Sequence, residues 1–197
     1  MSAAIRPALV RRGLRLEYLT LAWNAFEGAV AIAAGILAHS VALTAFGLDS
    51  SLEVFASMVT IWQLRGSTSA RDRRALRLIG ACFLLVAIYV GVQASLDLVL
   101  HRHPGTSPAG VALTASAAVA MILLGVAKLR VGRQLDNPVL KAEARFSLVD
   151  AGLSITVLVG LVLNLAFGWW WADAAAALVL AAFAFKEGLE GVRVTQS

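Results

Sequence analysis

The sequence predicts an all-α membrane protein: a bundle of six transmembrane helices whose termini both lie in the cytoplasm. The composition, the apolar stretches and the placement of the basic residues each support this prediction. Of the 197 residues, 59% are hydrophobic and only 15% are charged, and the mean hydropathy is +0.79. A soluble core surrounded by a polar surface does not reach such values, so we expect the chain to lie in a lipid bilayer.

Six apolar stretches are long enough to cross a bilayer, since about 20 helical residues span its hydrocarbon core. They comprise residues 16–37, 41–64, 76–100, 109–129, 146–167 and 170–188. The connections contain turn residues or charges, and the longest is expected at 130–145. We therefore expect one six-helix domain at 16–192, preceded by a basic cytosolic segment at 1–15 and followed by a short cytosolic tail at 193–197.

The basic residues predict the orientation of this bundle. All of the 17 Lys and Arg residues except Arg102 lie on the side of the N-terminus, the two longer loops and the C-terminus. Lys and Arg accumulate in cytoplasmic loops, so this side is expected in the cytoplasm, and the plasma (inner) membrane is the expected location. Because topology accounts for the pI of 10.1, we expect no nucleic-acid partner.

Three acidic residues lie deep within the apolar stretches. Asp49 and Glu53 are four residues apart and share one helical face, and Asp150 is in the fifth stretch. An ionised Asp costs about 2.5–3.5 kcal/mol near the bilayer centre. Only Arg145, near the cytosolic edge, is expected to approach these acids, so protons or a bound cation must neutralise them. They either form a cation site or only hydrogen-bond between helices as protonated acids.

Other polar residues are weaker candidates for the same pathway. Asn24 and Glu27 in the first stretch either line it or hydrogen-bond to a neighbouring helix. Asp97 and His101 have a spacing that suits a metal ion at the outer mouth, but solvated loop residues have the same pattern. Asp173 starts the sixth stretch, where the helix dipole favours an acid, so its role is either structural or at the outer mouth.

These residues, in this order, resemble the transmembrane domain of the cation diffusion facilitator (cation efflux) family over about 19–191. The resemblance rests on Asn24, on AGILAHSVALTAFGLDSSLEVFAS with Asp49 and Glu53, on KAEARFSLVDAGLS with Asp150, and on GWWWADAAAALVLAAFAFKEG with Asp173. It implies a homodimeric six-helix carrier that exchanges Zn(II) or a related divalent cation for protons. Asp49, Glu53 and Asp150 match three of the four metal ligands of that family.

The sequence departs from the family pattern in its ligands. Phe146 occupies the position of the fourth ligand, four residues before Asp150, so an intact four-ligand site is not expected. The remaining ligands are all oxygens, with a Glu at position 53, and this set also suits Mn(II), Fe(II) or Mg(II). Water, Glu27 or Glu143 would complete the shell. The cytosolic metal-binding domain that usually follows the sixth helix in this family is not expected here.

Two functional hypotheses remain open. The first is a divalent metal efflux transporter that works by metal/proton antiport, with the metal as substrate and no organic cofactor. The second is a non-transporting membrane subunit or regulator whose metal site has degraded at Phe146. An enzyme is not expected, because the sequence has no nucleophile and base pair, no phosphate-binding glycine loop and no HExxH motif.

Overall fold

The computed structural model describes residues 5–37, 41–101 and 108–193, and these ranges form six α-helices. The helices are α1 Ile5–Leu37, α2 Val41–Leu64, α3 Ser69–Val99, α4 Pro108–Leu135, α5 Pro138–Phe167 and α6 Ala172–Arg193. Within the described ranges there is no β-strand. The prediction of an all-α fold is therefore confirmed.

The connection between α4 and α5 is much shorter than the sequence suggests. Only Asp136 and Asn137 separate the two helices, so the prediction of a long loop at 130–145 is wrong. The side-chain Oδ1 of Asn137 accepts a hydrogen bond from the backbone N of Leu140 (2.9 Å), which caps the start of α5, and Pro138 follows at the first helical position. Both features favour a helix start inside a charged segment.

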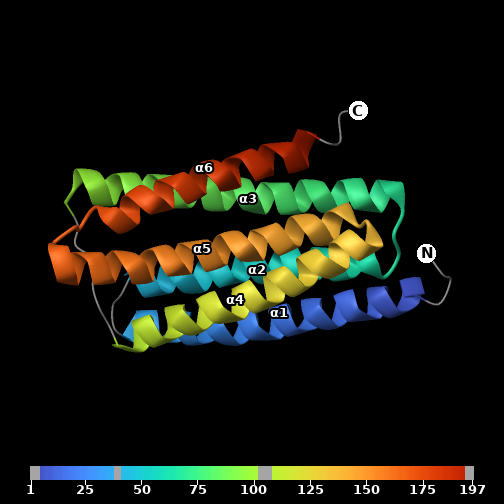
Figure 1. The fold of residues 1–197 in the computed structure, drawn as a ribbon, viewed down its shortest axis with the longest axis horizontal. Coiled ribbons are helices and arrows are strands. Elements are labelled where there is room, and N and C mark those ends of the chain that lie inside the picture. The colour runs from blue at the N-terminus through green and yellow to red at the C-terminus, as the bar shows by residue number, and fades with distance from the viewer. Residues whose placement is uncertain (1–4, 38–40, 102–107, 194–197) are drawn as a thin grey trace.

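The helices run back and forth along the long axis of the bundle, so the start of α1 and the end of α6 lie at the same end (Figure 1). The α2–α3 and α4–α5 connections lie at this end as well. We call it the basic end, because it gathers the segments rich in Lys and Arg. A six-span protein with both termini on one side requires this arrangement, and the placement of the basic end in the cytoplasm stays a prediction.

The helices pack in three main pairs, α1 with α2, α3 with α6, and α4 with α5. Glycines permit close contact in the first two pairs. A Cβ atom on Gly47 of α2 would lie 2.8 Å from the carbonyl oxygen of Gly28 on α1. A Cβ atom on Gly188 of α6 would lie 2.9 Å from the carbonyl oxygen of Gly80 on α3. Small residues of this kind let helix backbones approach closely in membranes.

The bundle is apolar on its outer surface and holds a group of polar side chains within an otherwise apolar interior. Large apolar side chains are exposed, among them Leu85 (56%), Ile88 (58%) and Val179 (71%), whereas Glu, Asn, Ser, Thr and Lys side chains are buried. Such an exposed apolar surface suits lipid better than water. By length and composition, two helices in the described part of the chain, Ser69–Val99 and Val111–Leu135, are apolar enough to cross a membrane. Six spans therefore stay a prediction.

Candidate functional site

Four acidic side chains from three helices lie near one another in the interior of the bundle. They are Glu27 of α1, Asp49 and Glu53 of α2, and Asp150 of α5, and we call them the acid cluster. Asp49 and Asp150 face each other closely enough to share a hydrogen bond when one of them holds a proton. Asp150 also interacts electrostatically with Glu53 and Glu27. The structure thus places the three expected ligands near one another, together with Glu27.

The acid cluster is buried, but its oxygens do not form a closed coordination shell. Glu53 and Glu27 are each 1% exposed, and Asp49 and Asp150 are half-buried. Among the described residues, no three His, Cys, Asp or Glu side chains converge closely enough to hold a metal ion. Binding a metal between these acids would therefore require their side chains to rotate toward a common point.

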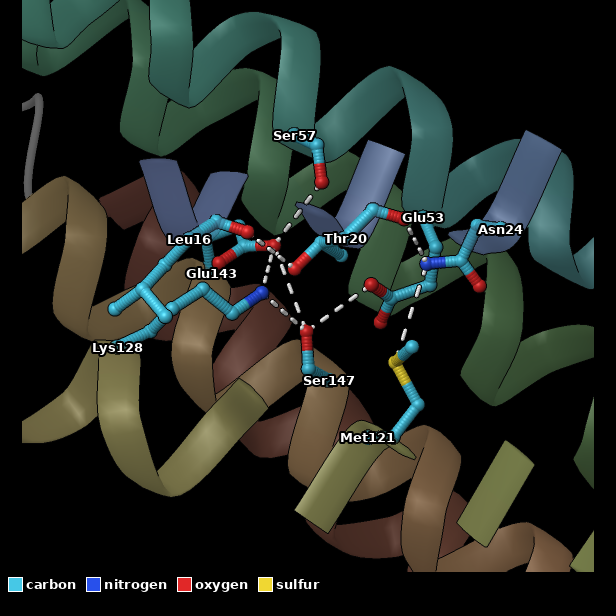
Figure 2. A network of polar contacts seen from close by, with 9 residues as sticks. All are labelled: Leu16, Thr20, Asn24, Glu53, Ser57, Met121, Lys128, Glu143 and Ser147. Carbon is cyan, nitrogen blue, oxygen red and sulfur yellow. Dashed lines mark hydrogen bonds and ion pairs between the residues drawn. The ribbon is translucent and has the colours of Figure 1, made fainter. Parts of the chain in front are cut away.

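A chain of hydrogen bonds with one ion pair adjoins the acid cluster at Glu53 (Figure 2). It lies nearer the basic end, because Glu143 and Ser147 precede Asp150 along α5. The Nζ of Lys128 lies 2.6 Å from Oε1 of Glu143 and donates a 2.7 Å hydrogen bond to Oγ of Ser147. Ser147 in turn donates to Oε2 of Glu53 (3.0 Å), and Ser57 donates to Oε1 of Glu143 (3.4 Å). Lys128, Glu143, Ser147 and Ser57 are called the Lys128 network, which ends on Glu53.

Lys128 corrects the expectation that only Arg145 approaches the acids. Because Lys128 lies close to Arg130, the sequence predicts that it is one of the loop residues that set the orientation. Its side chain is nevertheless fully buried. Arg145 instead pairs with Glu187 of α6 at 2.8 Å and is 46% exposed. Lys128 follows the fully buried Met121 by seven residues, or two helical turns on one face. Both side chains therefore lie on the inward face of α4.

Glu17 is a buried acid that was not among the candidates predicted from the sequence. It is fully buried on α1, and its strongest electrostatic neighbour is Glu143. Neither of its carboxylate oxygens has a hydrogen-bond partner within the described residues. The sequence does contain a signal for it, because Glu17, Thr20, Asn24 and Glu27 recur every three or four residues. This periodicity places all four on one helical face, and all four are buried.

An apolar layer lies between the Lys128 network and the basic end. A Cβ atom on Gly13 of α1 would lie 3.3 Å from Leu140, 3.4 Å from Leu64 and 3.7 Å from Val131, all of which are buried. These residues come from α1, α2, α4 and α5, the helices that contribute the acids and Lys128. These apolar residues therefore meet between the four helices at the basic end.

Comparison with known proteins identifies the family. The family model described as the cation efflux transmembrane domain matches residues 18–195. The chain belongs to the cation efflux family.

Two relatives illustrate the extent of the similarity. The magnetosome protein MamB of Magnetospira sp. (strain QH-2) is 26% identical over 167 residues, which are 79% of this chain and 57% of MamB. An uncharacterized transporter of Synechocystis sp. is 25% identical over 150 residues, which are 71% of this chain and 48% of that protein. The chain thus spans about half the length of the curated relatives it matches.

Phe146, at the position of the fourth ligand in the cation efflux resemblance, packs in the apolar core. Its ring meets that of Phe83 on α3 edge to face, with centroids 4.9 Å apart and an interplanar angle of 82°. The side chain is 3% exposed and belongs to an apolar cluster that joins α3 and α5. The side chain at this position therefore contributes packing and no donor atom.

Three further residues considered for the metal shell or pathway have different surroundings. The Nδ2 of Asn24 donates to the carbonyl oxygen of Thr20 (3.1 Å) and lies 3.9 Å from Sδ of Met121. Glu143 is already ion-paired. Glu27 lies in the acid cluster, and its Oε1 has no hydrogen-bond partner among the described residues. Of the three, Glu27 is the best placed to join a metal shell, and its role stays a prediction.

The residues expected at the outer mouth lie near the end opposite to the basic end. Oδ1 of Asp97 accepts a hydrogen bond from Nε2 of Gln93 (3.2 Å). The ring of His101 lies against that of Trp170, with centroids 4.7 Å apart. The side chain of Asp173 lies outside the described part of the structure. A metal-binding role for these residues stays a prediction.

Proposed function

We propose that this chain transports divalent metal cations across a membrane and that the acid cluster binds them on the way. The main support is that Asp49, Glu53 and Asp150 lie near one another inside a bundle whose outer surface is apolar. Buried acids in a membrane are costly to keep, and they commonly mark ion pathways. Membership of the cation efflux family agrees with this function.

The charge balance of the interior supports an exchange of metal for protons. Lys128 is ion-paired with Glu143, and no other Lys or Arg is buried in the described part of the chain. The acid cluster therefore needs positive charge from outside, which protons or a metal ion can supply. Because the two compete for the same oxygens, protonation on the outer side would release the metal.

The ligand chemistry bears on which divalent metal is the substrate. Zn(II) follows from the family resemblance, while an all-oxygen set also suits Mn(II), Fe(II) or Mg(II). Phe146 offers no donor atom and Glu143 is engaged by Lys128. We therefore propose Glu27 or water as the remaining ligand. The proposal includes a homodimer in the plasma (inner) membrane with both termini in the cytoplasm, which crosslinking and protease protection in membranes would test.

Transport by purified protein in proteoliposomes tests this function. With a pH gradient imposed, we expect uptake of Zn(II) by the wild-type chain and its loss in Asp49→Asn and Glu53→Gln. Asp136→Asn is a matched control, because this carboxyl group is 92% exposed at the basic end. If the two acid variants transport as fast as the control, the assignment of the acid cluster is wrong.

A second function is favoured by two observations. The acids of the described residues do not converge on a metal position, and Phe146 removes one ligand. Both features would suit a non-transporting subunit that pairs with another carrier. Such a subunit would neither bind divalent metal at the acid cluster nor transport it when reconstituted alone, whereas a transporter does both.

A further inference from the structure

Lys128 is a charged side chain inside the bundle to which the proposed metal exchange assigns no role. Its ammonium group is fully buried on α4 and touches Glu143 and Ser147 of α5. Its electrostatic partners among the charged residues are Glu143, Glu17 and Glu53, in that order of strength. The single positive charge of Lys128 thus interacts with three fully buried carboxyl groups, which come from α1, α2 and α5.

A single hydroxyl group links this ammonium to the acid cluster. Ser147 accepts a hydrogen bond from Lys128 (2.7 Å) and donates one to Glu53 (3.0 Å), as Figure 2 shows. Both side chains are buried, so the charge of Lys128 acts on Glu53 more strongly than it would at the protein surface. The Oε1 atom of Glu53, which has no hydrogen-bond partner among the described residues, remains available to a ligand.

We propose that Lys128 is a tethered counter-cation of the acid cluster and that its pairing with Glu143 sets how tightly the cluster binds a divalent cation. This inference rests on the proposed function. While Glu143 holds the ammonium, Glu53 keeps its negative charge for the substrate. Without the carboxylate of Glu143, the ammonium would remain on Ser147, next to Glu53, with no partner for its charge, and it would oppose metal binding. Lys128 and Glu143 are thus positioning residues that act on the metal through Glu53.

A purely structural role for the pair predicts different behaviour. Removing one member of a buried ion pair leaves an uncompensated charge, whereas replacing both with neutral groups is often tolerated. If the pair only holds α4 against α5, both single variants should weaken metal binding by loosening the site. If it sets the charge, the two single variants differ in the sign of their effect.

Zn(II) binding to the full chain in detergent, measured by calorimetry, separates these roles. We expect Glu143→Gln to bind Zn(II) about tenfold more weakly or worse, because the unpaired ammonium opposes the metal. Lys128→Gln should bind as tightly as the wild type or more tightly. The double variant should return to within about threefold of the wild type. Weaker binding by Lys128→Gln, equal binding by all four forms, or a double variant as weak as Glu143→Gln would overturn the proposal.

A second measurement does not depend on whether the Lys128 and Glu143 variants fold. The chain has three lysines, Lys128, Lys141 and Lys186, so 15N-lysine labelling gives three side-chain signals that Lys141→Arg and Lys186→Arg assign. Addition of Zn(II) should shift the Lys128 signal and leave the other two unchanged. A Lys128 signal that stays fixed while calorimetry reports Zn(II) binding would refute the tethered counter-cation. If the wild-type chain binds no Zn(II) at all, the proposed transport function itself fails for this metal.

Discussion

The acid cluster and the Lys128 network are neighbouring groups of buried polar side chains that meet the same physical problem in different ways. In the Lys128 network, Oε1 of Glu143 contacts the ammonium of Lys128 at 2.6 Å and receives a hydrogen bond from Ser57. In the acid cluster, Asp49 and Asp150 face each other, and Ser147 donates to Glu53. The Lys128 network contains its own positive charge, and the acid cluster consists of carboxyl groups alone.

The protein thus holds charge permanently in the Lys128 network and leaves the charge of the acid cluster open to exchange. A carboxylate with a resident ammonium is neutral without any ligand, so it suits a constant part of the interior. Carboxyl groups without one must take up protons or metal, and their charge therefore changes with what is bound. Ser147 forms hydrogen bonds with both groups, so a change of charge in one group alters the electrostatic environment of the other.

The largest effect is expected from breaking the ion pair. Lys128→Gln leaves Glu143 without its partner in a buried site, and such losses cost about 3–5 kcal/mol of stability. Lys128→Gln combined with Glu143→Gln should recover most of that loss, because no buried charge remains unpaired. Unfolding of the purified variants in detergent measures both values. Equal stability of the single variant and the wild type would show that the pair is not buried as described.

Removing a charge from the acid cluster should weaken metal binding more than it lowers the stability of the fold. Asp150→Asn replaces a carboxyl group that faces Asp49, and we expect Zn(II) affinity to fall about 100-fold, or about 2.7 kcal/mol. Stability should change little, because Asn is also polar and similar in shape. Calorimetry and unfolding of the same preparations separate the two effects, with Asp136→Asn as the exposed control. Unchanged affinity in Asp150→Asn would remove this residue from the site.

A ligand introduced at position 146 tests whether the acid cluster can gain a donor atom from α5. Phe146→His would place a metal ligand where the family resemblance expects one, but the side chain packs against Phe83. We expect a loss of about 2–3 kcal/mol of stability from the lost apolar packing, with no gain in Zn(II) affinity. Unfolding measures the stability of the variant, and calorimetry measures its Zn(II) affinity. A clear gain in affinity would mean that this position can turn toward the acid cluster.

The smallest expected effect is the response of metal binding to pH. Protons and metal compete for the carboxylate oxygens, so Zn(II) affinity should fall as the pH falls, by about tenfold per unit for each proton displaced. Calorimetry at several pH values gives this slope. Asp150→Asn should have a shallower slope than the wild type because it has one exchangeable carboxyl group fewer. A wild-type affinity that does not depend on pH would contradict exchange at the acid cluster.

Structural features that depend on a local pattern could be predicted from the sequence. The four-residue spacing of Asp49 and Glu53 predicts a shared helical face, and the apolar stretches predict α-helices that the structure confirms. The pattern was less informative at helix ends, because the cap provided by Asn137 lets α5 begin inside a charged segment. The depth of Lys128 was not evident, since a basic residue near the end of an apolar stretch reads equally well as part of a loop.

By itself, the sequence determined the helical, apolar character of the chain and the presence of more acids in its interior than bases, because composition and periodicity are properties of the chain alone. Which charges pair with one another became clear from the packing of the helices. Pairing depends on how far each helix is shifted and rotated against its neighbours, and that places Lys128 on Glu143 and Arg145 on Glu187. Shift and rotation follow from the packing of all six helices, which no single segment encodes.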